Sequence, residues 1–309
     1  MNLDLPRFVD IFEEGPREGF QIESPDIPTA DKVRFIDALS ETGVKHIQCV
    51  SFVNPKRVPG MADAEAVASA IARTEGVSYT GIWLNQQGLE RAARSTLDMG
   101  GELQVYASQT FGLKNSNRDD QQMLEEQRRY LNFYKEHGIP LDSLIVMTAF
   151  GCHYEGEIAI SRVCEQIASV LTLASEMGVQ VPRLRLADTV GLAVPTAVLR
   201  LVGAVRDRWP DLRIGLHLHD TRGSGLANCL AGLSLGVDSF DSACGGLGGC
   251  PFAGHRSAAG NICTEDFVFM CHEMGIETGI DLHKMVECAR LAERIVGHPL
   301  PSKLARTGV

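Results

Sequence analysis

The run Leu144-Ile145-Val146-Met147 is continuously apolar, and together with its flanks it decides the expected fold. Such a run is typical of a short strand buried on both faces, as the strands of a parallel sheet are. A strongly charged helical pattern over 119–137 precedes the run, and an amphipathic pattern over 163–177 follows it. Gly138 and Gly178 stand just after these patterns, where a helix commonly ends. This part of the chain therefore predicts a helix, a buried strand and a second helix.

The same alternation extends in both directions along the chain. The predicted strands cover 8–12, 46–52, 79–84, 102–107, 144–150, 183–187, 213–218 and 239–243. Helical patterns separate them, including one that opens near Thr29, the expected N-cap, and one over 196–208. Eight such alternations predict an α/β fold, a (β/α)8 TIM barrel over 1–280 with a C-terminal helix and tail over 281–309. A doubly wound open sheet is the alternative, but no Gly-x-Gly-x-x-Gly follows the first strand.

Composition narrows the possible functions. The chain has 309 residues, of which 44% are hydrophobic, which is enough for one large core. Its net charge of −10, without a strongly basic stretch, argues against nucleic-acid binding. No apolar run approaches the roughly 20 residues that span a bilayer, and residues 1–7 lack a signal-peptide core. The nine cysteines include no CxxC pair, as expected of reduced thiols. We therefore expect a cytoplasmic protein that binds neither membrane nor nucleic acid.

Two short motifs suggest chemistry. In His217-Leu218-His219-Asp220-Thr221 the two histidines stand two residues apart at the end of a predicted strand, so their rings project from one face. Two neutral imidazoles on one face can share a divalent metal ion. In the run 245–251 (GGLGGCP), Cys250 sits in a glycine-rich loop that can change shape around a ligand. Polar residues follow most of the other predicted strands, at the rim where barrel enzymes carry their active sites.

Six segments in this order resemble one known family. They are 14–21 (EGPREGFQ), 51–56 (SFVNPK), 151–156 (GCHYEG), 188–191 (DTVG), 217–221 (HLHDT) and 245–251 (GGLGGCP), with Gly260-Asn261 beyond the last. The chain is similar to the 3-hydroxy-3-methylglutaryl-CoA lyases, which belong to a wider superfamily of metal-dependent lyase and aldolase-type barrels that includes isopropylmalate synthase. The matches extend over nearly the whole chain and are highly specific when taken together.

The resemblance implies a metal-dependent reaction. A divalent ion, Mg²⁺ or Mn²⁺, would be held by Glu18, His217, His219 and Asn261. The implied reaction is retro-Claisen cleavage of a 3-hydroxyacyl-CoA with a carboxylate tail, which yields acetyl-CoA or a related acyl-CoA and a keto acid such as acetoacetate. The implied partners are the acyl-CoA substrate and a second copy of the chain, in a homodimer or larger homo-oligomer.

Four residues acquire catalytic roles from the same resemblance. Arg17 would stabilise the negative charge of the thioester enolate. His217 would shuttle protons while serving as a ligand, and Asp188 would assist proton transfer or orient a ligand. Cys250 would protonate the enolate carbon or close its loop over the site.

The chain departs from the family pattern near these residues. Glu18 replaces the usual aspartate, and Gln48 replaces a glutamate, which keeps the shape but loses the charge. The loop from Cys250 to Asn261 is longer than usual and adds His255 and Arg256, and Arg222 stands where a tyrosine is common. Residues expected to touch the substrate or to support the ligands are Gln48, Ser51, His153, Arg222 and Arg256. We hypothesise a shifted specificity, with Arg222 or Arg256 pairing with a different acid tail.

Other functions stay open at this point. The chain could cleave another acyl-CoA such as citramalyl-CoA, or run the reverse Claisen condensation. It could also be an aldolase for a 4-hydroxy-2-keto acid. A non-catalytic barrel that binds an acyl-CoA is the alternative from a different class, and Glu18 and Gln48 are its only support.

Overall fold

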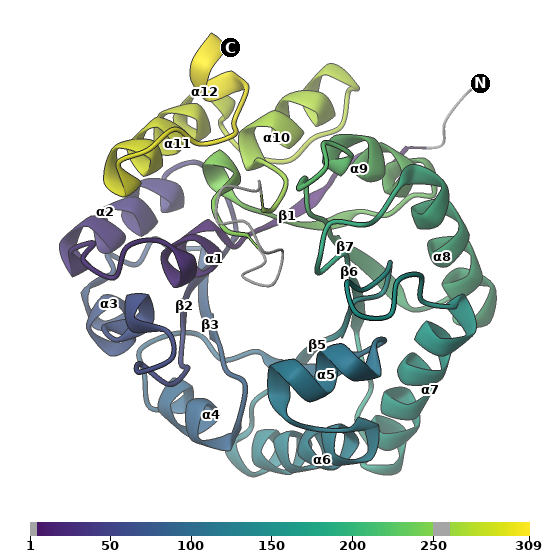
Figure 1. The fold of residues 1–309 in the computed structure, drawn as a ribbon. Helices are drawn as coiled ribbons and strands as arrows, with labels where there is room; N and C mark the ends of the chain where they lie inside the picture. Colours follow the sequence, from purple (N-terminus) through teal and green to yellow (C-terminus); the bar gives the residue numbers. More distant parts are fainter. Residues whose placement is uncertain (1–4, 250–259) are drawn as a thin grey trace. The chain divides into compact units, whose positions relative to one another are not determined.

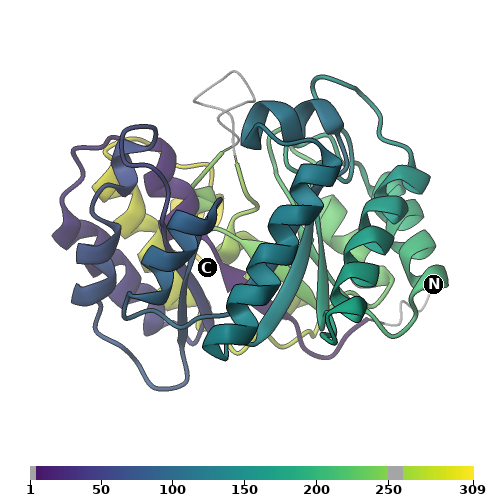
Figure 2. The same cartoon turned by 90° about the horizontal axis from the view of Figure 1, so that it is seen from below.

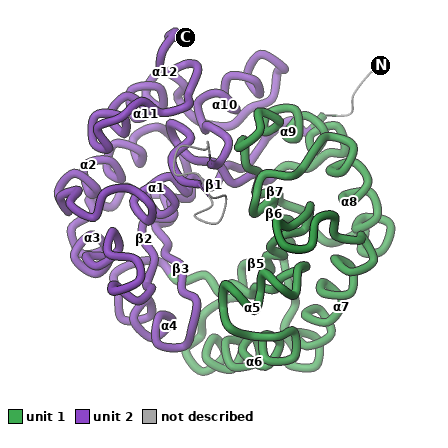
Figure 3. Tube along the Cα trace, in the orientation of Figure 1, with its two compact units in different colours: residues 1–5, 99–238 green, residues 6–98, 239–309 purple. Residues whose placement is uncertain are grey.

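The computed structural model describes residues 5–249 and 260–309, and its contacts divide the chain into two compact units (Figure 3). Unit 1 comprises residues 1–5 and 99–238, and unit 2 comprises residues 6–98 and 239–309. All eight predicted strands are present among the described residues, four in each unit.

Unit 1 contains four parallel strands in the order β4-β5-β6-β7. The strands are β4 (Gly101–Tyr106), β5 (Leu141–Met147), β6 (Arg183–Ala187) and β7 (Arg213–His217). The helices are α5 (Gln109–Ser116), α6 (Asp120–His137), α7 (Ile160–Glu176), α8 (Pro195–Arg208) and α9 (Gly225–Ser234). The long helices of this unit run alongside its strands (Figures 1 and 2). The strand-then-helix alternation predicted around residues 144–147 is therefore confirmed.

The strands of unit 1 are buried on both faces, but their interior is not purely apolar. All five residues of β6 are buried, including Arg183 and Arg185. Arg183 Nη2 lies 2.9 Å from Asp142 Oδ2, and Arg185 pairs with Glu102. These ion pairs satisfy charges that would otherwise be costly to bury. An arginine on alternate strand positions gives no sequence signal of burial, so the interior charges were not predicted.

Unit 2 contains the other four parallel strands, in the order β3-β2-β1-β8. They are β1 (Asp10–Glu13), β2 (His46–Ser51), β3 (Ser78–Ile82) and β8 (Ser239–Ser242). The helices are α1 (Gly15–Ile22), α2 (Thr29–Ser40), α3 (Ala64–Ala70), α4 (Gln86–Ala93), α10 (Thr264–Glu273), α11 (Leu282–Val296) and α12 (Leu304–Thr307), with short 3-10 helices η1 (Pro59–Met61) and η2 (Cys244–Gly246). Helix α11 and the tail match the extension predicted after residue 280, whose separation from the barrel as a domain stays a prediction.

Two local features of unit 2 differ from expectation. The motif that follows the first strand folds as helix α1 with Pro16 in its first turn, a position where no backbone N–H is needed. Thr29 is the first residue of α2, and Pro28 is its N-cap. The prediction of Thr29 as a cap was wrong because its hydroxyl donates to Asp63 Oδ2, 2.7 Å away, instead of accepting from its own helix.

Helix α6 of unit 1 begins with a reciprocal cap that gives a first test of the fold. Asp119 accepts a hydrogen bond from Gln122 N at 2.8 Å, and Gln122 Oε1 accepts one from Asp119 N at 3.0 Å. Asp119→Ala is expected to lower the free energy of unfolding in urea by about 1 kcal/mol, because it leaves helix donors unsatisfied. Glu136→Ala, at an exposed site of the same helix, should change it by less than about 0.5 kcal/mol. Equal effects of the two variants would contradict this cap.

Candidate functional site

The histidine pair stands at the end of β7 in unit 1. His217 and His219 are 7% and 5% exposed, and their Nε2 atoms lie 3.2 Å apart. The rings therefore converge on one face of the chain, as the two-residue spacing predicts. At this separation one nitrogen donates and the other accepts, which requires at least one neutral imidazole. A divalent ion would take the place of the shared proton, with both imidazoles neutral, so the convergence of the rings fits the predicted ligand role.

Asp188 follows β6 and is tied to the same strand end. Its backbone N–H donates to the carbonyl of His217 at 2.8 Å. Its Oδ1 accepts from Leu192 N at 2.8 Å and from Ala193 N at 3.1 Å, whereas its buried Oδ2 has no hydrogen-bond partner among the described residues. Burial raises the pKa of Asp188 to about 6. A carboxyl group with a free oxygen and a pKa near neutrality is suited to proton transfer.

Arg17 lies on α1 in unit 2 and is almost fully buried. Its Nη2 donates to Glu14 Oε2 at 2.5 Å, its Nη1 pairs with Glu18 and its Nε donates to Gln48 Oε1. Two carboxylates and one amide thus fix the plane of the guanidinium group. Glu14, the N-cap of α1, was not predicted as part of this group, although its place three residues before Arg17 is a usable signal.

Glu18 and Asn261 lie beside each other in unit 2, next to Gly248. A Cβ atom on Gly248 would lie 2.5 Å from Glu18 Cβ and 3.0 Å from Asn261 Nδ2, and the φ angle of Gly248 is +92°. Asn261 is 1% exposed; its Nδ2 donates to Leu247 O at 3.3 Å, and its Oδ1 has no partner among the described residues. An amide oxygen without a partner and a glutamate carboxylate are both ligand types that Mg²⁺ and Mn²⁺ prefer. These two residues also fit the predicted ligand role.

The remaining predicted residues have varied surroundings. Ser51 is buried at the end of β2, and its hydroxyl lacks a partner among the described residues. His153 is exposed in the turn that Cys152 and Gly156 close. Arg222 Nη1 donates to the carbonyls of Val190 and Gly191, at 2.9 and 2.7 Å, and so braces the turn after Asp188. Cys250, His255 and Arg256 lie outside the described residues. The substrate roles of all these residues stay predictions.

Unit 2 contains a buried carboxyl group that the sequence did not predict. Glu13, the last residue of β1, accepts from Gly15 N at 2.8 Å, Cys244 N at 2.9 Å and Thr264 Oγ1 at 2.6 Å. It therefore joins the start of α1 to the segment that enters the glycine-rich loop. Burial raises the pKa of Glu13 to about 7. Two consecutive glutamates after an apolar strand are typical of an exposed segment, yet Glu13 and Glu14 are both buried.

Glu265, the second residue of α10, predicts a pH dependence of stability. It is fully buried, and burial raises its pKa from 4.5 to about 8. Between those pH values the folded chain holds a proton that the unfolded chain releases, so this contribution to stability is lost as the pH rises through the window. In thermal unfolding, the free energy of unfolding of Glu265→Gln minus that of the wild type should rise by a few kcal/mol between about pH 5 and 8. A constant difference between the two proteins would contradict the assignment.

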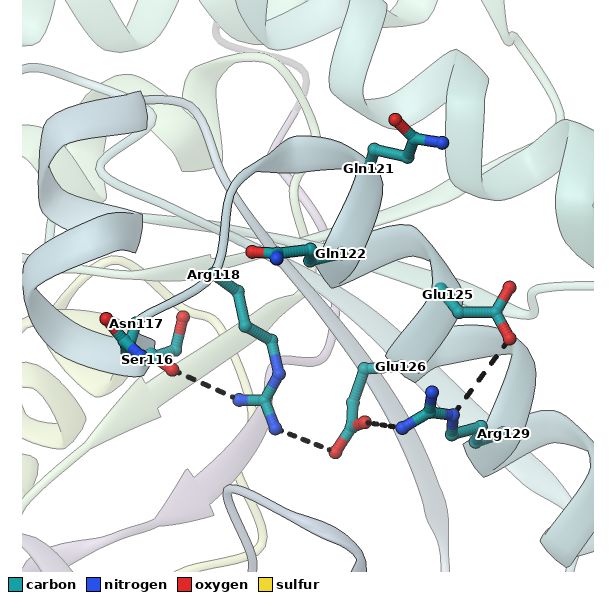
Figure 4. Close-up of a pocket in the computed structure, with 8 residues that line it drawn as sticks. All are labelled: Ser116, Asn117, Arg118, Gln121, Gln122, Glu125, Glu126 and Arg129. Carbon is teal, nitrogen blue, oxygen red and sulfur yellow. Dashed lines mark hydrogen bonds and ion pairs between the residues drawn. The ribbon is translucent and has the colours of Figure 1, made fainter.

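A polar cavity of unit 1 lies at α5 and α6, and it contains none of the predicted site residues (Figure 4). In it, Glu126 accepts from Arg118 Nη2 at 3.1 Å and from Arg129 Nη1 at 3.5 Å. Arg118 also donates to the carbonyl of Ser116 at 3.3 Å. Arg129 Nε also lies 4.0 Å from Glu125 Oε1, so two carboxylates balance the two arginines, and the cavity has the character of a surface ion-pair network.

Solved structures define the class of the protein. The chain matches the crystal structure of a Bacillus subtilis HMG-CoA lyase with a TM-score of 0.89 and 36% identity, covering 98% of both chains. It matches an HMG-CoA lyase of Acinetobacter baumannii in complex with coenzyme A and 3-methylmalate with a TM-score of 0.86 and 37% identity, over 98% and 95% of the chains. The carboxyl transferase domain of Rhizobium etli pyruvate carboxylase, at 16% identity and a TM-score of 0.66, shares the fold alone. The predicted (β/α)8 barrel class is confirmed.

Family membership follows from sequence relatives. The chain belongs to the HMGL-like family, whose model matches residues 8–292. It is 38% identical to a hydroxymethylglutaryl-CoA lyase of Bacillus subtilis over 97% of both chains. It is 35% identical to the human cytoplasmic 3-hydroxy-3-methylglutaryl-CoA lyase over 98% of this chain and 79% of the relative. The chain is therefore a carbon–carbon lyase of a metal-dependent family, and the resemblance inferred from the six motifs is confirmed.

Proposed function

We propose that this lyase cleaves 3-hydroxy-3-methylglutaryl-CoA, or a similar 3-hydroxyacyl-CoA with a carboxylate tail. The products are acetyl-CoA, or a related acyl-CoA, and a keto acid such as acetoacetate. The observation that carries the proposal is the buried Arg17, fixed by Glu14, Glu18 and Gln48 on a helix that also borders Asn261. The coenzyme A and 3-methylmalate in the Acinetobacter baumannii structure support an acyl-CoA carrying a hydroxylated acid.

The proposal includes a divalent cation, Mg²⁺ or Mn²⁺, held by Glu18, Asn261, His217 and His219. When bound, such an ion supplies Lewis acidity that makes a substrate hydroxyl group easier to deprotonate. The support comes from each unit by itself. Unit 1 has the converging imidazoles, and in unit 2 the Asn261 amide oxygen has no partner among the described residues and Gly248 borders both Asn261 and Glu18. Glu18 stands where the family usually has an aspartate, and its Cβ atom and the Asn261 amide nitrogen both border Gly248, which has no side chain.

The chain's own residues then account for the proton and charge movements. His217 accepts the proton of the C3 hydroxyl group, and Asp188, with its open Oδ2, relays that proton or orients the imidazole. The bond between C2 and C3 breaks; C3 becomes a ketone, and the electron pair passes to the thioester as an enolate. The fixed positive charge of Arg17 stabilises the enolate oxygen. Cys250 delivers a proton to C2, which completes the acyl-CoA product.

A cytoplasmic location and a homodimer or larger homo-oligomer are also part of the proposal. Relatives include cytoplasmic and mitochondrial enzymes. In the part of the chain that the structure describes, no helix has both the length and the apolar character needed to cross a membrane. Light scattering during size-exclusion chromatography tests the oligomeric state, and a monomer at micromolar concentration would contradict that part of the proposal.

A substrate panel tests the proposed reaction. The purified chain, with Mg²⁺ or Mn²⁺, is assayed with 3-hydroxy-3-methylglutaryl-CoA, citramalyl-CoA and a 4-hydroxy-2-keto acid, and both cleavage products are measured. Turnover of the first compound at about 1 s⁻¹ or faster is expected. Turnover of citramalyl-CoA alone would instead show that Glu18, Gln48 and the neighbouring arginines mark a shifted specificity. Turnover of the keto acid alone, or of nothing, would overturn the proposal in favour of an aldolase or an inert barrel.

A further inference from the structure

The segment 297–301 of unit 2, here the C-terminal strap, packs against the 3-10 turn η2. A Cβ atom on Gly245 would lie 2.7 Å from Leu300 Cδ1, and one on Gly246 would lie 2.6 Å from Pro301 Cγ. Both glycines have positive φ angles, +70° and +71°. Leu300 is 5% exposed, so the contact is buried. The strap thus fills the space directly over a turn that only glycine can form so closely.

The strap is held rigidly in place. Prolines flank Leu300 on both sides and restrict its backbone. The Leu300 N–H donates to Glu293 Oε2 at 3.0 Å, and its carbonyl accepts from Arg306 Nη2 at 2.8 Å. At the start of the strap, His298 Nε2 lies 2.9 Å from Glu23 Oε2, at the end of α1. These contacts hold the backbone of Leu300, and so the point from which its side chain extends toward Gly245.

The other side of the turn faces the residues of the proposed site. Beyond η2 the chain runs along α1, where a Cβ atom on Gly19 would lie 3.0 Å from Leu247 Cβ. The next residue, Gly248, borders Glu18, and Leu247 O accepts from Asn261 Nδ2 at 3.3 Å. Residues 244–248 are therefore packed between the strap and the helix that carries Arg17 and Glu18.

The first turn of α10 binds both the glycine turn η2 and the residues that follow the C-terminal strap. Both side-chain oxygens of Glu265 lie within hydrogen-bonding distance of Gly245 N, at 3.1 and 3.0 Å. Its neighbour Asp266 accepts from Lys303 N and Leu304 N, each at 3.0 Å at the shortest. Two consecutive acidic side chains thus bind the glycine turn and the residues just after the strap. Because α10 begins three residues after Asn261, the strap is also linked to that residue.

We propose that Leu300 is a positioning residue: by pressing on Gly245 it holds residues 244–248 against α1 and so keeps Glu18 and Asn261 at their mutual distance. Removing the Leu300 side chain leaves the fold in place but lets the turn move away from α1. The inference rests on the proposed function for its consequence at the metal, whereas its structural part, a turn held by the strap, stands independently. The experiment therefore measures the mobility of the turn and the affinity for Mn²⁺ separately.

Hydrogen exchange and Mn²⁺ binding measured by electron paramagnetic resonance are compared for Leu300→Ala, Leu300→Met and the wild type. Leu300→Ala is expected to speed amide exchange over 245–247 by about tenfold and to weaken Mn²⁺ binding by about tenfold. Leu300→Met, which refills the volume, should restore both. The control is Leu97→Ala, which truncates a leucine of similar burial, 7% exposed, in the same unit. It should lower Tm comparably while leaving both readouts within twofold of the wild type.

Each outcome decides one of the two claims. Unchanged exchange over 245–247 in a folded Leu300→Ala protein would overturn the claim that Leu300 holds the turn, whatever the metal data show. Faster exchange with unchanged Mn²⁺ affinity would overturn the positioning role. A wild type that binds no Mn²⁺ would contradict the proposed metal site but leave the exchange comparison valid. Equal losses of Mn²⁺ affinity in Leu300→Ala and Leu97→Ala would reduce the effect to general destabilisation and so overturn the proposal.

Discussion

Arg17→Gln is expected to lower kcat by about 10²- to 10³-fold, because it removes the only fixed positive charge proposed to face the developing enolate. The neutral amide keeps some hydrogen bonding to Gln48 but leaves the carboxylates of Glu14 and Glu18 without their cation. Steady-state kinetics with the cleaved acyl-CoA measures the loss. We expect it in kcat more than in KM, since the charge acts on the transition state.

Two further variants distinguish a loss of catalysis from a loss of folded protein. Arg17→Lys keeps the charge in the buried site but cannot donate to three partners in fixed directions, so it should remain folded and still lose activity. Arg73→Gln, the control, removes a guanidinium group that pairs with Asp98 at 2.6 Å on the exposed side of the same unit. It should leave kcat within about twofold, as expected of an exposed ion pair. Arg17→Gln activity within threefold of the wild type would contradict the assigned role.

Gly248→Ala is expected to weaken Mn²⁺ binding by about 10- to 100-fold, a loss typical of disturbed support around a metal site. The new methyl group would lie 2.5 Å from Glu18 Cβ, a separation that requires the backbone or α1 to move. The φ angle of +92° adds a further cost for any residue with a Cβ atom. The loss should appear in metal titrations before any substrate is added.

The matched control separates crowding from backbone strain. Gly138 has a φ angle of +64°, but a Cβ atom there would meet nothing within 4 Å. Gly138→Ala should therefore show a cost in stability of about 1–2 kcal/mol and no change in Mn²⁺ affinity. If Gly248→Ala bound Mn²⁺ as tightly as Gly138→Ala, the placement of Glu18 beside Asn261 would be wrong.

Sequence reasoning reached the fold because burial on both faces leaves a strong signal. Continuous apolar runs such as 144–147 located the strands, and the alternation fixed their number. The same pattern does not predict which charged residues are buried. Arg185 lies in a predicted strand, but its burial beside Glu102 has no signal in the sequence. Helix α1 was missed as a helix because its motif is short and glycine-rich.

The site was predictable where local spacing determines geometry. The two-residue separation of His217 and His219 placed their rings on one face without any tertiary information. The proximity of Glu18 to Asn261 is different, since it depends on how two distant segments pack around Gly248. The family resemblance predicted that Glu18 and Asn261 act together, whereas the periodicity of the sequence contained no indication of it. Glu13 and Leu300 carried neither a motif nor a pattern, so their contacts emerge only from the folded chain.

Product analysis with metal-free and metal-restored enzyme is the most direct test of the proposed metal-dependent cleavage. The chain is stripped of metal with a chelator and incubated with 3-hydroxy-3-methylglutaryl-CoA, first without and then with added Mg²⁺ or Mn²⁺, and acetyl-CoA and acetoacetate are quantified. We expect equal molar amounts of the two products, formed only after the metal is restored. Release of free coenzyme A with the intact acid, or cleavage that proceeds equally without metal, would contradict it.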